Sequence, residues 1–174
     1  MDIPVIETER LILRGHAIED FPSYAAMWKE PVVTRFIGGA PLSEEEAWAK
    51  FLRMTGHWAL MGYGFWAIVE KSSGARIGEA GILNVKRDMQ PSFHGVPEIG
   101  WGLLPSMHGK GYATEAVNAA LDWGRGFFGH GARTVCVIST DNAASLRVAE
   151  KAGFKQFATA TRYGLGRLVF ERML

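Results

Sequence analysis

The stretch from Leu103 to Ala113 has residue types and spacing that could bind an anion. Gly109 and Gly111 remove side chains from a turn, so that neighbouring backbone N–H groups could converge on one point. A helical pattern begins directly after the turn, and the first turn of a helix adds free N–H donors and a partial positive charge. The stretch therefore predicts a phosphate or pyrophosphate site, with a ligand-free tight turn as the alternative.

Two common phosphate-binding motifs do not fit this stretch. A Walker loop requires Ser or Thr after its lysine, whereas Lys110 is followed by Gly111. A dinucleotide-binding fingerprint requires a third glycine, whereas Thr114 occupies that position. The turn therefore belongs to neither of these motifs, although binding of a nucleotide such as ATP or NAD stays open as a hypothesis.

The elements that must position the turn are predicted from hydrophobic periodicity. Gly100 and Gly102 lie inside the preceding apolar run, and glycine within a strand indicates a bulge or a close approach by a ligand. The helix after the turn carries an apolar stripe at helical spacing. The predicted order is a strand at 11–13, helices at 19–29 and 43–58, strands at 65–70, 76–83 and 98–103, a helix at 112–128, a strand at 135–138, a helix at 141–152, and strands at 154–160 and 167–173.

This order predicts a mixed α/β (α+β) sheet with helices on its faces. A doubly wound parallel fold fits less well, because three consecutive strands between residues 65 and 103 leave no room for crossover helices. The chain has 174 residues, of which 48% are hydrophobic and 21% are charged, and we expect one packed domain over residues 1–174.

Composition also limits the partners and the location of the protein. A net charge of +1 gives no broad electrostatic reason to bind nucleic acid or an anionic membrane. The single cysteine, Cys136, excludes an intramolecular disulfide and a cysteine-based metal cluster, and its apolar strand predicts a core role. Acidic residues near the N-terminus do not fit a secretory signal, and the longest uncharged run is too short to span a membrane. We expect a soluble, cytoplasmic protein that binds no metal, nucleic acid or membrane.

The segment from His108 to Ala113 resembles the Gln/Arg-x-x-Gly-x-Gly/Ala signature of the GNAT superfamily of acetyl-CoA-dependent N-acetyltransferases, except at its first position. The segment from Asn142 to Phe154 resembles the second family segment. Glu9 to Arg14 and Glu98 to Trp101 look most like the Rim-type branch, which includes enzymes that acetylate the N-termini of ribosomal proteins. The resemblance covers essentially the whole chain. It implies a mostly antiparallel twisted sheet, splayed at the acetyl-CoA site, with helices on both faces.

The resemblance also implies a set of cofactor-binding residues. Leu103 would offer backbone groups to pantetheine at the splayed strand, and Asn142 would bind the pantetheine arm, with a helix cap as the alternative role for Asn142. The pyrophosphate would be held by His108, Gly109, Lys110, Gly111, Tyr112 and Ala113.

The sequence departs from the family pattern at two positions. His108 replaces the family's Gln or Arg, and we expect little loss because the contribution is largely the backbone N–H. Ala149 stands where many members have a tyrosine that protonates the leaving thiolate. Ser145 is the nearest substitute for this acid, and an ordinary first-turn residue is its alternative role.

The implied reaction also requires a neutral amine. Deprotonating a lysine with a pKa of about 10.4 at pH 7 costs roughly 4.6 kcal/mol, whereas an α-amine costs only about 1–1.4 kcal/mol. Glu98 is the first candidate base, because burial among aromatic residues would raise its pKa. Its alternative role is to bind the substrate ammonium or to pair with an arginine. Glu79 and His94 are reserve candidates.

The resemblance thus implies an acetyl-CoA-dependent transferase, acting as a monomer or homodimer, whose acceptor is a protein N-terminus or a small-molecule amine. A non-catalytic acyl-CoA-binding or sensory module on the same fold is the main alternative. A nucleotide-binding protein unrelated to CoA is the third.

Overall fold

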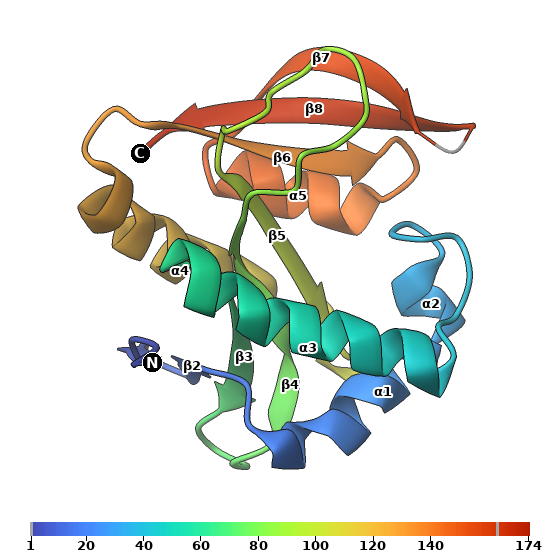
Figure 1. Ribbon diagram of the computed structural model, residues 1–174, viewed down its shortest axis with the longest axis vertical. Helices are drawn as coiled ribbons and strands as arrows, with labels where there is room; N and C mark the ends of the chain where they lie inside the picture. Colours follow the sequence, from blue (N-terminus) through green and yellow to red (C-terminus); the bar gives the residue numbers. More distant parts are fainter. Residues whose placement is uncertain (1, 163) are drawn as a thin grey trace.

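The strands of the protein form one eight-stranded sheet in the order β1-β2-β3-β4-β5-β6-β8-β7 (Figure 1). The structure is a computed structural model, and it describes residues 2–162 and 164–174. Neighbouring strands are antiparallel except for β5 and β6, which run parallel. The strands are β1 (Ile6–Glu7), β2 (Leu11–Arg14), β3 (Phe65–Glu70), β4 (Arg76–Leu83), β5 (Glu98–Leu103), β6 (Arg133–Ser139), β7 (Lys155–Arg162) and β8 (Leu165–Met173).

The helices follow local signals in the sequence, with one addition. Ser43 caps the third α-helix through a capping box, in which the Ser43 amide donates to the Glu46 carboxylate over 2.7 Å. The same helix ends at Gly62, which has a φ of 73°. A short helix at Pro31–Thr34 was not predicted from periodicity, since it is only one turn long. The α-helices are α1 (Phe21–Lys29), α2 (Pro31–Thr34), α3 (Glu44–Met61), α4 (Tyr112–Phe128) and α5 (Ala143–Lys151).

The two faces of the sheet are covered by different helices. On β4, Ala80 and Ile82 point into the main apolar core, which they share with α4. An added Cβ at Gly124 of α4 would lie 2.9 Å from Ile82 Cδ1, so this glycine lets the helix pack closely on the strand. Glu79, which directly precedes Ala80 on β4, points to the opposite face, where α1 and α3 pack. Helix α3 crosses the front of the sheet in Figure 1.

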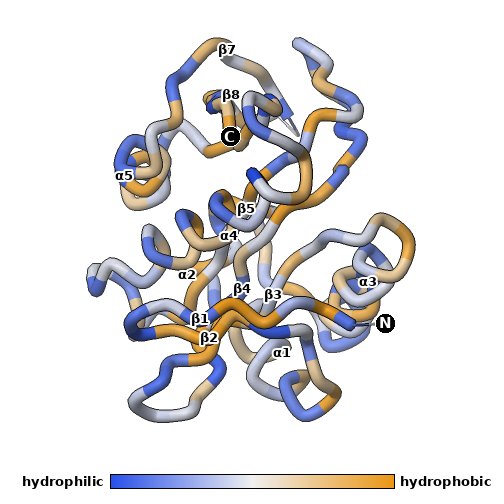
Figure 2. The backbone as a smooth tube through the Cα atoms, turned by 90° about the vertical axis from the view of Figure 1, so that its left-hand side faces the viewer, coloured by the Kyte–Doolittle hydropathy of each residue, from blue (hydrophilic) through white to orange (hydrophobic). Residues whose placement is uncertain are grey.

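The sheet opens between β5 and β6. These parallel strands are paired only at Glu98 and Val135, near the start of both, and they diverge toward their carboxyl ends. The predicted mixed sheet with a splayed strand pair is thus confirmed. The loop from 84 to 97 packs Met89 and Phe93 on the β6–β8 half of the face opposite α4. Figure 2 shows α2 and α5 on the same side of the molecule, with α4 and β5 between them.

None of the helices within the described residues combines the length and the apolar character that a membrane crossing requires.

Candidate active site

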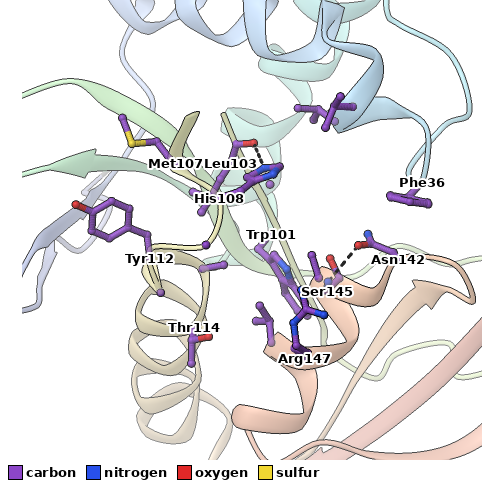
Figure 3. A pocket seen from close by; sticks show the side chains of 18 of the residues that line it. Phe36, Trp101, Leu103, Met107, His108, Tyr112, Thr114, Asn142, Ser145 and Arg147 are labelled. Atoms are coloured by element: carbon purple, nitrogen blue, oxygen red, sulfur yellow. Dashed lines mark hydrogen bonds between the residues drawn. The ribbon is translucent and has the colours of Figure 1, made fainter. Parts of the chain in front are cut away.

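A cavity of about 420 Å³ lies in the opening between β5 and β6 (Figure 3). Its walls come from the end of β5, the turn that follows, the first turn of α4, one side of α5, and α2. The residues of this cavity that the sequence singled out are Leu103, His108, Gly109, Gly111, Tyr112, Ala113, Asn142 and Ser145. The cavity thus brings together two segments that are about thirty residues apart in the chain.

The turn before α4 exposes a row of backbone donors at one end of the cavity. Gly109 and Gly111 have φ values of 77° and 84°, a left-handed conformation that glycine adopts without strain. Among the described residues, none accepts a hydrogen bond from the amides of residues 109–114. The amide of Glu115 is the first to donate within the helix, to Gly111 O over 3.1 Å. These free amides at a helix N-terminus form a geometry suited to a phosphate group.

The segment between the N-terminal strands β1 and β2 holds this turn in place from outside the cavity. The Arg10 guanidinium donates to the carbonyl of Lys110 over 2.9 Å, and Arg10 Nε donates to the Glu115 carboxylate over 2.7 Å. Thr8 Oγ1 also donates to Glu115, over 2.6 Å. These contacts lower the pKa of Glu115 even though its partial burial acts in the opposite direction. Sequence reasoning missed this bracing, because the partners are about a hundred residues apart.

Two side chains of the turn serve the local structure. His108 Nε2 donates to Leu103 O over 3.0 Å, as the dashed line in Figure 3 shows, and this closes the turn onto the end of β5. The Tyr112 hydroxyl donates to Glu70, which directs the ring away from the cavity. Lys110 is exposed and does not line the cavity, and its Nζ lies 3.6 Å from Met107 Sδ. The charge of Lys110 therefore points outside the turn.

Helix α5 presents polar groups to the other side of the cavity. Asn142 Oδ1 accepts a hydrogen bond from the Ser145 amide over 3.1 Å, so the helix-cap role is present. The amide NH₂ of Asn142 is a separate donor group and can face a ligand at the same time. Arg147 and Lys151 also line the cavity and add positive charge. Their four-residue spacing on one helix was the sequence signal for these two cations, and sequence reasoning missed it.

Glu98 lies on the opposite face of β5 and does not line this cavity. Its carboxylate is 7% exposed and accepts from Arg87 Nε over 2.7 Å, with a second hydrogen bond from Arg87 Nη2. His94 Nε2 donates to the Arg87 carbonyl over 2.8 Å and so braces the same loop. Of the two roles expected for Glu98, the arginine pairing is present in the structure.

Glu79 belongs to a buried polar cluster on the same face as Glu98. Its carboxylate lies 3.5 Å from Lys50 Nζ and 3.7 Å from His16 Nε2, and the residue is 1% exposed. Burial lowers the pKa of His16 to about 4, so the imidazole is neutral at pH 7. Arg76 lies over the Tyr24 ring, and its guanidinium nitrogens have no hydrogen-bond partner within the part of the chain that the structure describes. Sequence reasoning named only Glu79 of this cluster.

The register of the sheet places Glu79 beside the open end of β5. Glu79 is the antiparallel partner of Gly102, which lines the cavity. A Cβ added to Gly102 would meet no atom within 4 Å. The absence of a side chain there leaves open space over the strand next to the Glu79 carboxylate.

Cys136 is buried in β6, and burial raises the pKa of its thiol well above the ordinary range. Such a thiol stays protonated and is a poor nucleophile. Over residues 2–162 and 164–174, no group of three or more His, Cys, Asp or Glu side chains is arranged to hold a metal ion.

Comparison with known proteins assigns the fold to a family. The acetyltransferase (GNAT) domain profile matches residues 10–155. A putative GNAT-family acetyltransferase from Bordetella pertussis is 31% identical, with a TM-score of 0.84 over 97% of this chain and 99% of that one. RimL, a ribosomal-protein alpha-N-acetyltransferase solved with coenzyme A, is 18% identical with a TM-score of 0.76, over 98% of both chains, and shares the fold.

This chain belongs to the GNAT acetyltransferase family. An uncharacterized N-acetyltransferase, p20, from Bacillus licheniformis is 30% identical over 67% of this chain and 64% of its own length. The first curated relatives are thus matched over slightly less than two thirds of their length.

Proposed function

We propose that this protein transfers the acetyl group of acetyl-CoA to a primary amine. The observation that carries the proposal is the row of free amides from 109 to 114 at the edge of the opening between β5 and β6. The free amides of residues 109–114 would bind the pyrophosphate, whereas the His108 amide, also expected to contribute, already donates to Pro105 O over 3.1 Å. Leu103 and Asn142 would hold the pantetheine arm along the unpaired edge of β5. Arg147 and Lys151 favour the negative charge of the carrier.

In the proposed reaction, the neutral amine attacks the thioester carbonyl carbon directly. The new C–N bond forms, the C–S bond breaks, and the sulfur leaves with the bonding electron pair as a thiolate. The amine nitrogen loses one proton and the thiolate gains one, so the charges balance. Ser145 lines the cavity and is the proposed proton donor to sulfur. Backbone N–H groups near Leu103 would polarise the carbonyl, where one donor is typically worth about 2.7–4 kcal/mol.

Glu98 is the proposed base that takes the proton from the amine, directly or through a water molecule. It precedes Gly100 and Gly102 on β5 and faces the side of the sheet opposite α4. An acceptor amine approaching from that side could reach the thioester past Gly100 and Gly102, because neither residue has a side chain to block it. The cost of deprotonation favours an α-amine over a lysine amine as the acceptor. A protein N-terminus and a small-molecule α-amine both meet this requirement.

The proposal is tested by measuring thiol release from acetyl-CoA with a panel of amines, together with the binding of CoA by calorimetry. We expect CoA to bind and at least one α-amine to be acetylated. Tight binding of CoA without turnover on any amine would favour an acyl-CoA-binding or sensory module. The alanine at position 149, in place of the tyrosine of many family members, supports this alternative. Thermal stabilisation by ATP or NAD but not by CoA would contradict both ideas.

A further inference from the structure

A second cavity, of about 490 Å³, lies at the carboxyl end of β6, on the side of the sheet that carries the loop from 84 to 97. Its lining is polar and includes Gln90 from that loop, Thr140 from the end of β6, and Arg167 from β8. The remaining lining comes from β7 and from Gly166. A polar cavity with a buried cation is suited to a charged ligand rather than to an apolar one.

Arg167 is the group in this cavity that lacks a counter-ion. It is 5% exposed, and one of its nitrogens donates to the neighbouring Gly166 carbonyl over 3.2 Å. Within the described residues, no carboxylate forms an ion pair with it. Burial, together with the positive charges of Arg162 and Arg87, lowers the pKa of the Arg167 guanidinium. A buried arginine beside other arginines favours an anion, because an anion would offset the cost of burying the charge.

The position of this cavity connects it to the reaction. Thr140 lines it, and Asn142, two residues further along the chain, lines the acetyl-CoA cavity. Arg167 pairs in register with Ser139. Two residues further along β8, Val169 packs with Met89 of the loop, so Arg167 faces the same side of the sheet. Glu98 faces that side too, because it contacts Arg87 of the same loop. The cavity therefore lies on the face from which an acceptor amine would approach.

We propose that the cavity at Arg167 binds a carboxylate of the acceptor, so that the preferred substrate is an amine that also carries a carboxylate. This inference rests on the proposed acetyl transfer. Two acceptors present this chemistry, a free amino acid and a peptide with an acidic residue close to its N-terminus. A polyamine would instead bring positive charge to a cavity whose charged neighbours are arginines, and it is disfavoured for that reason.

The test compares matched acceptors with the full-length protein. One arm uses a free amino acid and its amide, and the other uses two hexapeptides that differ only by Glu or Gln at the second and third positions. We expect kcat/KM to be about tenfold higher or more for the carboxylate in at least one arm, since charge-assisted hydrogen bonds commonly reach this size. The arm that shows the preference identifies the source of the carboxylate. Equal rates for carboxylate and neutral acceptors in both arms would overturn the inference.

Variants then assign the preference to this cavity. Arg167→Gln should raise the KM of the carboxylate acceptor about tenfold, with kcat and the KM for acetyl-CoA unchanged. Arg133→Gln is the matched control, because Arg133 pairs with Glu171 at the far end of the same strands and does not line the cavity. We expect the control to behave as wild type. If Arg167→Gln lowered kcat/KM equally for carboxylate and neutral acceptors, the assignment of the preference to this cavity would be refuted.

A second variant keeps the test valid if Arg167→Gln fails to fold. Gln90 is exposed in the loop, and Gln90→Glu places a negative charge at the cavity without altering the packing of Arg167. It should raise the KM of the carboxylate acceptor and leave the neutral acceptor unaffected. If the preference for the carboxylate acceptor were unchanged in Gln90→Glu, the cavity would not be the carboxylate site. If CoA binds but no amine of either kind is acetylated, the proposed function fails, whereas acetylation without charge preference overturns only this inference.

Discussion

The two faces of β5 carry different chemistry. On the α4 side, the cavity proposed for acetyl-CoA offers the free backbone amides of one continuous stretch, residues 109–114. On the opposite side, the groups are charged side chains from separate segments, such as Glu79, Glu98 and Arg167. A carrier that is common to a whole family can be bound by main-chain geometry, whereas a particular acceptor has to be distinguished by side chains. The three predictions below test this difference.

The largest expected effect is on the α4 side. Gly111→Val places a β-branched residue at a φ of 84°, which such residues rarely adopt. The turn must therefore change its path, and the amides would no longer converge. We expect acetyl-CoA binding to be abolished, because several oriented donors are lost together and each donor to a charged group is worth about 1.5–3 kcal/mol. Isothermal calorimetry with CoA measures this loss.

The matched control is another glycine of the same region. Gly126→Ala lies within α4, where an added Cβ would meet no atom within 4 Å. Alanine favours a helix by about 0.5–1 kcal/mol, so we expect equal or greater stability and unchanged CoA binding. If CoA raised the melting temperature of Gly111→Val as much as that of the wild type, the pyrophosphate would bind elsewhere.

The same contrast explains what the sequence could predict. The turn with Gly109 and Gly111 was identified because its function depends on neighbouring residues in a local conformation. The capping box at Ser43 was predictable for the same reason, and the mixed sheet was predictable from the order of the elements along the chain. The bracing of Glu115 by Arg10 could not be predicted, since nothing in local periodicity reports which distant strand meets a helix.

On the acceptor face, the partners could not be predicted from local pattern either. Glu98 was singled out as a residue, but its pairing with Arg87 depends on how an irregular loop folds back over β6 and β8. The cluster of Glu79 with His16 and Lys50 joins a strand, a loop and a helix. Individual charged residues on this face could therefore be singled out from the sequence, but their ion-pair partners are evident only from the tertiary structure.

The second prediction concerns the proposed base. Glu98→Gln should lower kcat by about 10²–10⁴-fold, as is typical when a general base is removed, with acetyl-CoA affinity unchanged. Glu171→Gln is the matched control, because it also removes the carboxylate partner of an arginine, and the register places it two strands away from Glu98, beyond Val135. Steady-state kinetics over a range of pH compares the variants, and CoA calorimetry with thermal melting reports whether each is folded.

A double variant separates catalysis from ion pairing. If Glu98 takes the proton, Arg87→Gln combined with Glu98→Gln stays as slow as Glu98→Gln alone. If Glu98 serves only to neutralise the Arg87 guanidinium, removing both charges restores much of the rate, because no unpaired charge is left buried. An unchanged pH–rate profile in Glu98→Gln would also remove this carboxylate from the mechanism.

The smallest effect is a pH dependence of stability from the buried cluster. His16 is held neutral with a pKa of about 4, whereas an unfolded histidine has a pKa near 6.5. As pH falls below 6.5, the unfolded state takes up the proton first, so the free energy of unfolding decreases until about pH 4. The decrease from this residue is about 3 kcal/mol, from the difference between the two pKa values. Urea unfolding at pH 7 and pH 4.5 measures this change, and the free energy of unfolding should decrease clearly less for His16→Gln than for the wild type. Equal decreases in the two proteins would mean that this imidazole is accessible to protons in the folded protein.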